Sequence, residues 1–218
     1  MKIGVIVALD QEYSELHRLL GGRAEGMIGN NEIVLAKSGI GKVNAALGAA
    51  KLINEYPLDC IVNTGVAGGL SPKLGSLDVI AAERVVYHDV WCGAGNAYGQ
   101  VQGLPEMFRS HPTLYGTALS LGPKVHGGLL ASGDFFISSK AEADAILARF
   151  PDAVAVDMES AAIAQTCWLH GVPFLSLRII SDVAGEDHQS EYDNFWATVA
   201  EDSFNAVREF LEALPANL

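Results

Sequence analysis

The sequence has few of the residues that would indicate a secreted, membrane-embedded or nucleic-acid-binding protein. Its three cysteines are widely separated and in no C-x-x-C spacing, which argues against a disulfide framework and a zinc site. No apolar run approaches the roughly 18 residues of a membrane span. Asp and Glu outnumber Lys and Arg by 26 to 14, the wrong balance for binding a phosphate backbone. We therefore expect a cytoplasmic protein with a small-molecule ligand and neither nucleic acid nor membrane as a partner.

Half of the 218 residues are hydrophobic and 18% are charged, which suffices for a substantial core and predicts one domain over residues 1–218. Apolar runs predict strands at Lys2–Leu9, Ala24–Gly29, Glu32–Lys37, Asp59–Asn63, Asp78–His88, Val125–Ser132, Ala153–Val156 and Pro173–Ile180. Helical spacing predicts helices at Asp10–Leu20, with Asp10 as the cap, and at Gly41–Tyr56, Pro112–Leu121, Ser138–Phe150, Glu159–His170 and Glu191–Leu214. This alternation predicts a three-layer α/β/α fold with a mixed, largely parallel sheet.

Two glycine-rich segments interrupt this alternation. Thr64–Gly75 follows a predicted strand, and Asp89–His111 has no clear period. A long loop without regular structure is commonly functional or interfacial, so we expect the second segment to serve one of these purposes.

Ligands of open α/β sheets bind beyond the carboxyl ends of the strands, so polar residues at these ends are candidates for a site. They occur in Asp10–Glu12, Gly65–Gly69, Asp157–Glu159 and Ser181–Asp182. Neither Gly39–Lys42 nor Gly65–Gly69 matches a nucleotide-cofactor motif. Each acid also has an ordinary explanation, because carboxylates stabilise helix starts and Asp is common in loops and caps.

Taken together, the segments are more specific than each alone. They are Val5–Glu12, Ser38–Val43, Asn63–Gly69, Ser132–Asp134 with Phe136-Ile137, Val156–Glu159 and Arg178–Asp182. In this order and spacing the chain resembles the 5′-methylthioadenosine/S-adenosylhomocysteine nucleosidases, within the nucleoside phosphorylase superfamily, over nearly its whole length. The resemblance implies the fold of that superfamily and hydrolysis of the N-glycosidic bond of adenine nucleosides without a cofactor.

The resemblance also implies a role for each acid. Asp182 would protonate N7 of adenine, Glu12 would hold and deprotonate water, and Glu159 would clamp the ribose hydroxyls. Arg178 would lie near the water and Glu159. These residue types suit the chemistry, because cleavage through an oxocarbenium-like state needs an acid at the leaving group and a carboxylate-held water at the sugar. Asp182 would need a desolvated site that keeps it protonated.

The other residues implied to contact substrate are mainly apolar or small. Met158 would pack on the ribose, Phe136 would stack on the purine, and Ser181 would orient the acid. The remaining implied contacts are Ile40, Ala67, Gly68, Ile137 and Tyr192. Tyr192 and the neighbouring Phe195 match an aromatic position near the ribose, although core packing explains them equally well.

Two departures from the family pattern leave the preferred 5′ substituent open. Val66 stands where many members have Ser. The segment Val90–Gly103 lacks the aromatic residue that, in relatives, reaches into the neighbouring subunit's 5′ pocket.

The resemblance implies a homodimer, and we expect its interface to include part of Asp89–His111. The apolar residues of this segment would otherwise form an exposed patch or fold back onto their own domain. They are Val90, Trp91, Leu104, Pro105 and Phe108. No metal is expected, because Glu186-Asp187-His188 has the composition of a solvated loop and not the spacing of a metal site.

Two other functions remain open from the sequence. A phosphorolytic purine nucleoside phosphorylase would need basic groups converging on a phosphate, whereas Leu9–Leu20 offers Asp10, Glu12 and Glu15. A catalytically silent nucleoside-binding protein is the other alternative, since a fold does not fix a function.

Overall fold

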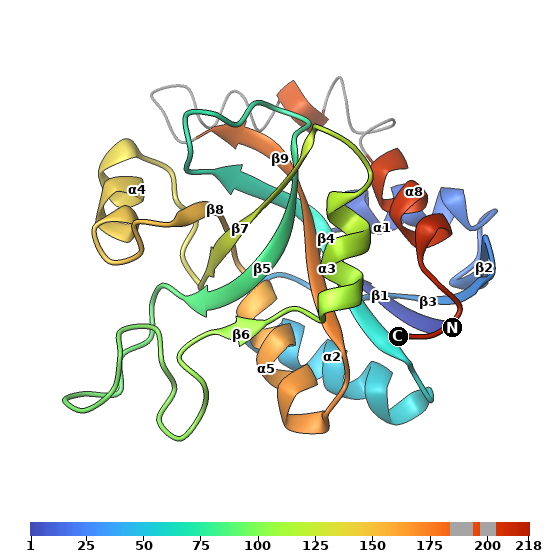
Figure 1. Ribbon diagram of the computed structural model, residues 1–218, viewed down its shortest axis with the longest axis horizontal. Helices are drawn as coiled ribbons and strands as arrows, with labels where there is room; N and C mark the ends of the chain where they lie inside the picture. The colour runs from blue at the N-terminus through green and yellow to red at the C-terminus, as the bar shows by residue number, and fades with distance from the viewer. Residues whose placement is uncertain (184–193, 197–203) are drawn as a thin grey trace.

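The computed structural model describes residues 1–183, 194–196 and 204–218. Within these residues nine strands form one mixed sheet in the order β2-β3-β1-β4-β8-β7-β5-β6, and β9 pairs with both β4 and β5 (Figure 1). The strands are β1 (Lys2–Val7), β2 (Glu25–Ile28), β3 (Asn31–Lys37), β4 (Cys60–Gly69), β5 (Val79–Tyr87), β6 (Phe108–Arg109), β7 (Val125–Ser132), β8 (Ala153–Asp157) and β9 (Phe174–Val183). The helices are α1 (Asp10–Leu19), α2 (Lys42–Glu55), α3 (Pro112–Leu119), α4 (Lys140–Leu147), α5 (Ser160–His170) and α8 (Asn205–Ala213).

The pairing of the strands confirms a mixed sheet in which the long pairings are mostly parallel. Strand β1 is parallel to β3 and β4, β9 is parallel to β4, and β7 is parallel to β5 and β8. Strand β4 also meets β8 at Gly68–Gly69, and β5 meets β9 at Val79–Ala81, both antiparallel. Strands β4, β8, β7, β5 and β9 therefore form a closed circuit, which the sequence did not predict.

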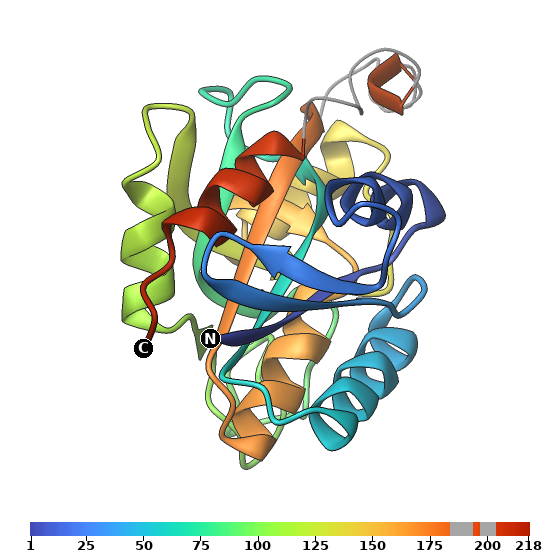
Figure 2. The same ribbon diagram turned by 90° about the vertical axis from the view of Figure 1, so that its right-hand side faces the viewer.

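Helices cover both faces of the sheet and confirm the three-layer arrangement (Figures 1 and 2). On one face α1, α3 and α8 bury Leu16, Leu114 and Phe210 against β1, β3, β4 and β9. On the other face α2 and α5 lie side by side and bury alanines such as Ala45 and Ala161, whose small side chains allow close packing. A third cluster packs α4 against β5, β7 and β8.

The glycine-rich segments differ from the sequence prediction. Thr64–Gly69 is not a loop but the second half of β4, because its backbone pairs with β9 and β8. Strand β9 continues past Ile180 to Val183, so that Ser181 and Asp182 lie within a strand and not after it.

The segment Asp89–His111 is partly packed on its own chain. It contains the short strand β6, in which Phe108 is buried, and Val90 and Leu104 pack against the core of the α2 face. Part of this segment thus folds back onto its own domain, which was the alternative to an interface, whereas Trp91 is 65% exposed. No helix in the described ranges is long and apolar enough to cross a membrane.

Candidate active site

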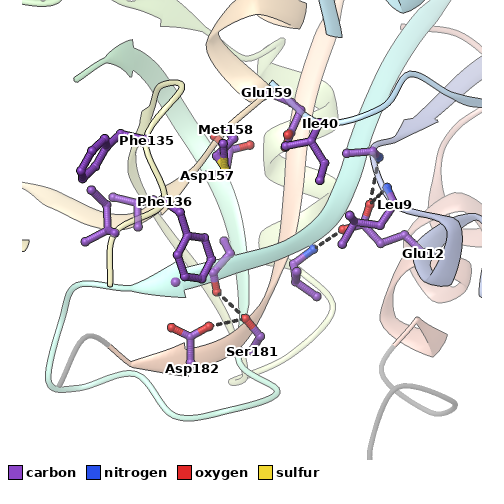
Figure 3. Close-up of a pocket in the computed structure, with 16 residues that line it drawn as sticks. Leu9, Glu12, Ile40, Phe135, Phe136, Asp157, Met158, Glu159, Ser181 and Asp182 are labelled. Atoms are coloured by element: carbon purple, nitrogen blue, oxygen red, sulfur yellow. Dashed lines mark hydrogen bonds between the residues drawn. The ribbon is translucent and has the colours of Figure 1, made fainter. Parts of the chain in front are cut away.

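A pocket opens at the carboxyl ends of β1, β8 and β9 and the second half of β4, where the sequence predicted a ligand site (Figure 3). Ten of the twelve residues expected to act on or contact substrate line it: Glu12, Ile40, Ala67, Gly68, Phe136, Ile137, Met158, Glu159, Ser181 and Asp182. Glu12 and Asp182 lie on opposite sides of the pocket in Figure 3, and Phe136 points toward Asp182. The pocket thus brings together residues from six separate segments of the chain.

Glu12 is fixed in the pocket wall by backbone amides. Its Oε2 accepts hydrogen bonds from the amides of Ala8 and Leu9, both 2.9 Å, and its Oε1 accepts one from Val66, also 2.9 Å. The helix cap is therefore Leu9, not Asp10 as predicted, because the third helical residue reaches back to the cap amide. Burial raises the pKa of Glu12, although Arg178 and these amides favour its ionised form.

Arg178 does not line the pocket but lies buried beneath it, on β9. Its guanidinium is ion-paired with Asp157 and, at 3.4 Å, with Glu159, and it donates a 2.8 Å hydrogen bond to Asn63. A buried arginine needs such partners, since an unpaired buried charge is costly. Arg178 therefore holds the acids of β8 and the following turn in place from below.

Glu159 follows β8 and caps α5. Its Oε1 accepts a 3.0 Å hydrogen bond from the amide of Gly41, at the start of α2, and Figure 3 shows its side chain beside Ile40. Burial raises the pKa of Glu159 to about 7, with Asp157 contributing in the same direction and Arg178 opposing. Glu159 is therefore a carboxyl group that changes charge near neutral pH.

An irregularity in β9 explains how two adjacent residues both face the pocket. Ala67 of β4 is opposite Ile180, but Gly68 is opposite Asp182, so Ser181 is an extra residue in β9. Such a bulge interrupts the alternation of side chains. Ser181 donates a 2.5 Å hydrogen bond to Oδ1 of Asp182, and both residues are buried. Ser181 is thus placed to orient the Asp182 carboxyl group.

Some lining residues were not expected from the sequence. Leu9 and Phe135 contribute to the pocket. Asp157, which belongs to a candidate segment but had no role assigned to it, lines the pocket as well as pairing with Arg178. The sequence could have indicated Leu9 and Phe135 only through their neighbours, because Leu9 precedes the candidate segment Asp10–Glu12 and Phe135 precedes Phe136. Tyr192 and the cluster Glu186–His188 lie outside the described residues. Phe195 is buried in the core and packs edge-on against Trp196, with ring centroids 5.3 Å apart.

Comparison with known proteins agrees with this geometry. Residues 2–212 match the family model described as the phosphorylase superfamily. The chain is 38% identical to the 5′-methylthioadenosine/S-adenosylhomocysteine nucleosidase of Geobacillus kaustophilus, over 98% of each chain. It is 39% identical to the nucleosidase of that name from Neisseria meningitidis, solved with methylthio-immucillin-A, with a TM-score of 0.91 over 98% of this chain and 99% of that one.

A further solved structure is similar but carries a different name. The futalosine hydrolase of Helicobacter pylori is 30% identical, with a TM-score of 0.88 over 98% of both chains. The relatives at 38–39% identity share one name, which assigns the subgroup. The chain belongs to the phosphorylase superfamily and, within it, to the 5′-methylthioadenosine/S-adenosylhomocysteine nucleosidases.

Proposed function

We propose that this protein hydrolyses the N-glycosidic bond of 5′-substituted adenine nucleosides, 5′-methylthioadenosine and S-adenosylhomocysteine, and releases adenine and the 5′-substituted ribose. The observation that carries the proposal is the pair of buried carboxyl groups, Glu12 and Asp182, on opposite sides of one pocket. They supply the two groups that hydrolysis of such a bond requires. The names of the relatives support the same substrates.

Asp182 acts at the purine side of the pocket. Its carboxyl group donates a proton to N7 of adenine, so that the base leaves as a neutral molecule. Ser181 keeps the carboxyl group oriented, and Phe136 provides an aromatic face for the purine. As the bond breaks, positive charge develops on the ribose, and the carboxylates of Glu12 and Glu159 stabilise it.

Glu12 acts at the sugar side. Three backbone amides hold its carboxylate, so it is oriented before substrate arrives. A water held by Glu12 attacks the anomeric carbon, and Glu12 takes its proton. Because burial raises the pKa of Glu12, its carboxylate is a stronger base than an exposed one. Glu159 accepts hydrogen bonds from the ribose hydroxyls, and Arg178 fixes Glu159 from below.

The charge of the pocket favours water over phosphate as the nucleophile. Among the described residues that line it, four are acids and none is Lys, Arg or His. The buried Arg178 is already paired with Asp157 and Glu159. A phosphate dianion would meet carboxylates without the cationic partners it needs.

The direct test incubates the protein with a panel of nucleosides, with and without phosphate, and identifies the products by mass. The panel contains 5′-methylthioadenosine, S-adenosylhomocysteine, adenosine, inosine and a futalosine. We expect adenine and a free 5′-substituted ribose from the first two at equal rates with and without phosphate. Strict dependence on phosphate with a ribose 1-phosphate product would contradict hydrolysis, and no adenine from any substrate would indicate a silent binding protein. A marked preference for the futalosine would reassign the 5′ group.

We further propose that the protein is a homodimer. The pocket residue Ile40 is half-exposed, and the adjoining helix α2 exposes Val43 and Leu47 one turn apart. Trp91 is exposed as well, two residues after Asp89, which is ion-paired to Lys42 at the start of α2. Large exposed apolar side chains gathered around one helix are typical of an interaction surface.

The remaining proposals concern the cellular setting. Cys60, Cys92 and Cys167 are free thiols, which suits the reducing cytoplasm. Removal of methylthioadenosine with release of adenine and methylthioribose fits methionine salvage.

The match of residues 2–212 to one family supports a single domain over residues 1–218.

A further inference from the structure

A cluster of charged residues outside the pocket joins the start of α2 to the segments that follow β5 and β7. Lys42 is the first residue of α2 and follows the turn after β3, Asp89 follows β5, and Asp134 follows β7. The ammonium group of Lys42 lies 2.7 Å from Oδ2 of Asp89 and 3.9 Å from Oδ2 of Asp134. It also lies 5.6 Å from the centroid of the Tyr87 ring. None of these residues has a role in the mechanism above.

Backbone hydrogen bonds tie the same residues together. Oδ1 of Asp134 accepts a 2.7 Å hydrogen bond from the amide of Lys42, and Oδ2 of Asp89 accepts a 2.8 Å hydrogen bond from the amide of Asp134. The fit around Gly41 is close, because its φ is +90° and a Cβ there would lie 2.9 Å from Oδ1 of Asp134. The two carboxylates and the ammonium group thus fix both the side chains and the backbones of three segments.

Two of these segments, those of Lys42 and Asp134, carry pocket residues close to the charged residue. Ile40 and Gly41 precede Lys42, and Gly41 donates the amide hydrogen bond to Glu159. Phe136, which faces the purine side, comes two residues after Asp134. A shift of the start of α2 relative to Asp134 would therefore change the distance between Glu159, on the ribose side, and Phe136, on the purine side.

We propose that Lys42 is a positioning residue for the nucleosidase reaction: through Asp89 and Asp134 its ammonium group holds the start of α2 against the end of β7, so that Glu159 and Phe136 contact one nucleoside together. This inference rests on the proposed function. The side chains of Lys42 and Asp89 are about a quarter exposed and that of Asp134 is 44% exposed. Ion pairs this exposed contribute little to overall stability, so their effect is on local geometry.

The test compares Lys42→Met with Lys51→Met, a control on the same helix whose exposed ammonium group meets Glu55 at 3.9 Å. With 5′-methylthioadenosine we expect Lys42→Met to raise KM about tenfold and to change kcat less than about threefold, because the network acts on ground-state and transition-state binding alike. The midpoint of thermal unfolding should stay near that of the unchanged protein. Lys51→Met should change neither constant, and Lys42→Arg should restore KM to within about threefold.

A double-mutant cycle tests whether Lys42 acts through its ion pair with Asp89. As a single substitution, Asp89→Asn should raise KM. Combined with Lys42→Met, it should raise KM by less than about a further twofold, because the ion pair is already broken. An unchanged KM in Lys42→Met, or independent effects of the two substitutions, would overturn the proposal. If Lys42→Met does not fold, Asp89→Asn alone carries the comparison of KM.

Adenine release by the unchanged protein is measured first and separates the two levels of inference. If no adenine is released, the proposed function fails, and calorimetric titration of Lys42→Met and Lys51→Met with uncleaved 5′-methylthioadenosine then tests the positioning role. Equal affinities of these two variants would overturn it.

Discussion

At the residue scale, Asp182 provides the sharpest test of the mechanism. Asp182→Asn preserves the size of the side chain and the oxygen that accepts the hydrogen bond from Ser181. An amide cannot donate the proton that the leaving purine needs, so we expect kcat for 5′-methylthioadenosine to fall by about 10²- to 10⁴-fold or more. Thermal unfolding should show an intact fold. Activity near that of the unchanged protein would remove Asp182 from the mechanism.

Glu12→Gln should differ from Asp182→Asn in its effect on stability. Both carboxylate oxygens of Glu12 accept backbone amides, so either orientation of a Gln amide places an NH₂ group against an N–H donor. We expect Glu12→Gln to be nearly inactive and also to lower the free energy of unfolding by about 1–3 kcal/mol. Denaturant unfolding measures the second effect. A variant that hydrolyses substrate normally would exclude Glu12 as the base.

Gly65 separates Glu12 from Arg178, and its backbone has φ +139°. A Cβ at this position would overlap Oε1 of Glu12 and lie 2.7 Å from Nη1 of Arg178. Gly65→Ala should therefore displace the Glu12 carboxylate and lower kcat by about 10²-fold or more. Gly122→Ala is the matched control, because Gly122 has φ +140° and a Cβ there meets no atom within 4 Å. Equal kcat values for the two variants would show that the site tolerates a shift of Glu12.

Because the carboxyl group of Glu159 titrates near neutral pH, we expect pH to affect activity and stability in opposite directions. Because burial raises the pKa of Glu159 from 4.5 to about 7, the ribose clamp loses its charge as pH falls through 7, and kcat/KM should fall with it. A raised pKa in the folded state means that folding favours the proton. The contribution of Glu159 to the free energy of unfolding is therefore fully present below pH 4.5 and lost as pH rises through about 7.

The control for this prediction is Glu159→Gln, which cannot titrate at this position. Its difference from the unchanged protein in free energy of unfolding should vary with pH between about 4.5 and 7 and be constant above that range. Parallel pH curves for the two proteins across this range would show that Glu159 does not titrate there.

At the scale of elements, hydrophobic patterning predicted most helices and strands but failed where glycine and polar residues continue a strand. Thr64–Gly69 has the composition of a loop, yet it extends β4 because β9 and β8 supply its hydrogen-bond partners. Strand propensity describes a residue on an ordinary pleated surface. On such a surface a strand favours large side chains, but at position 65 the strand needs a glycine, because the absence of a side chain makes room for Glu12 and Arg178.

The elements also determine how much of the site could be predicted. The resemblance carried by the sequence segments singled out Glu12, Glu159 and Asp182, and all three line one pocket. Their hydrogen bonds could not be predicted, because these depend on pairings between distant segments, such as the bulge of β9 opposite Ala67 and Gly68. The burial of Arg178 below the pocket likewise arises from three partners on β4, β8 and the turn after β8.

At the scale of the whole molecule, the closed circuit of strands brings together three acids of the pocket, because Asp157 lies on β8, Glu159 follows it and Asp182 lies on β9. Strands β4 and β9 belong to the closed circuit and both reach the pocket, together with β8. The chain as a whole carries a net charge of −12, and four acids lie in this one pocket. Such a site suits a neutral nucleoside that becomes cationic during the reaction and disfavours a polyanionic ligand.

The homodimer is the last prediction and involves the surface beside the pocket. If the exposed face of α2 and the loop that bears Trp91 meet a second copy, Trp91→Ala removes a large apolar contact. We expect Trp91→Ala to weaken association, measured by light scattering, or to raise KM more for S-adenosylhomocysteine than for 5′-methylthioadenosine. The reason for the second effect would be that the longer 5′ group reaches farther toward the interface. Met27→Ala is the control, because Met27 is similarly exposed but lies on β2, at one end of the strand order. A monomer at micromolar concentration would refute the dimer. An unchanged oligomeric state and unchanged KM values in Trp91→Ala would exclude this loop from both the interface and the 5′ pocket.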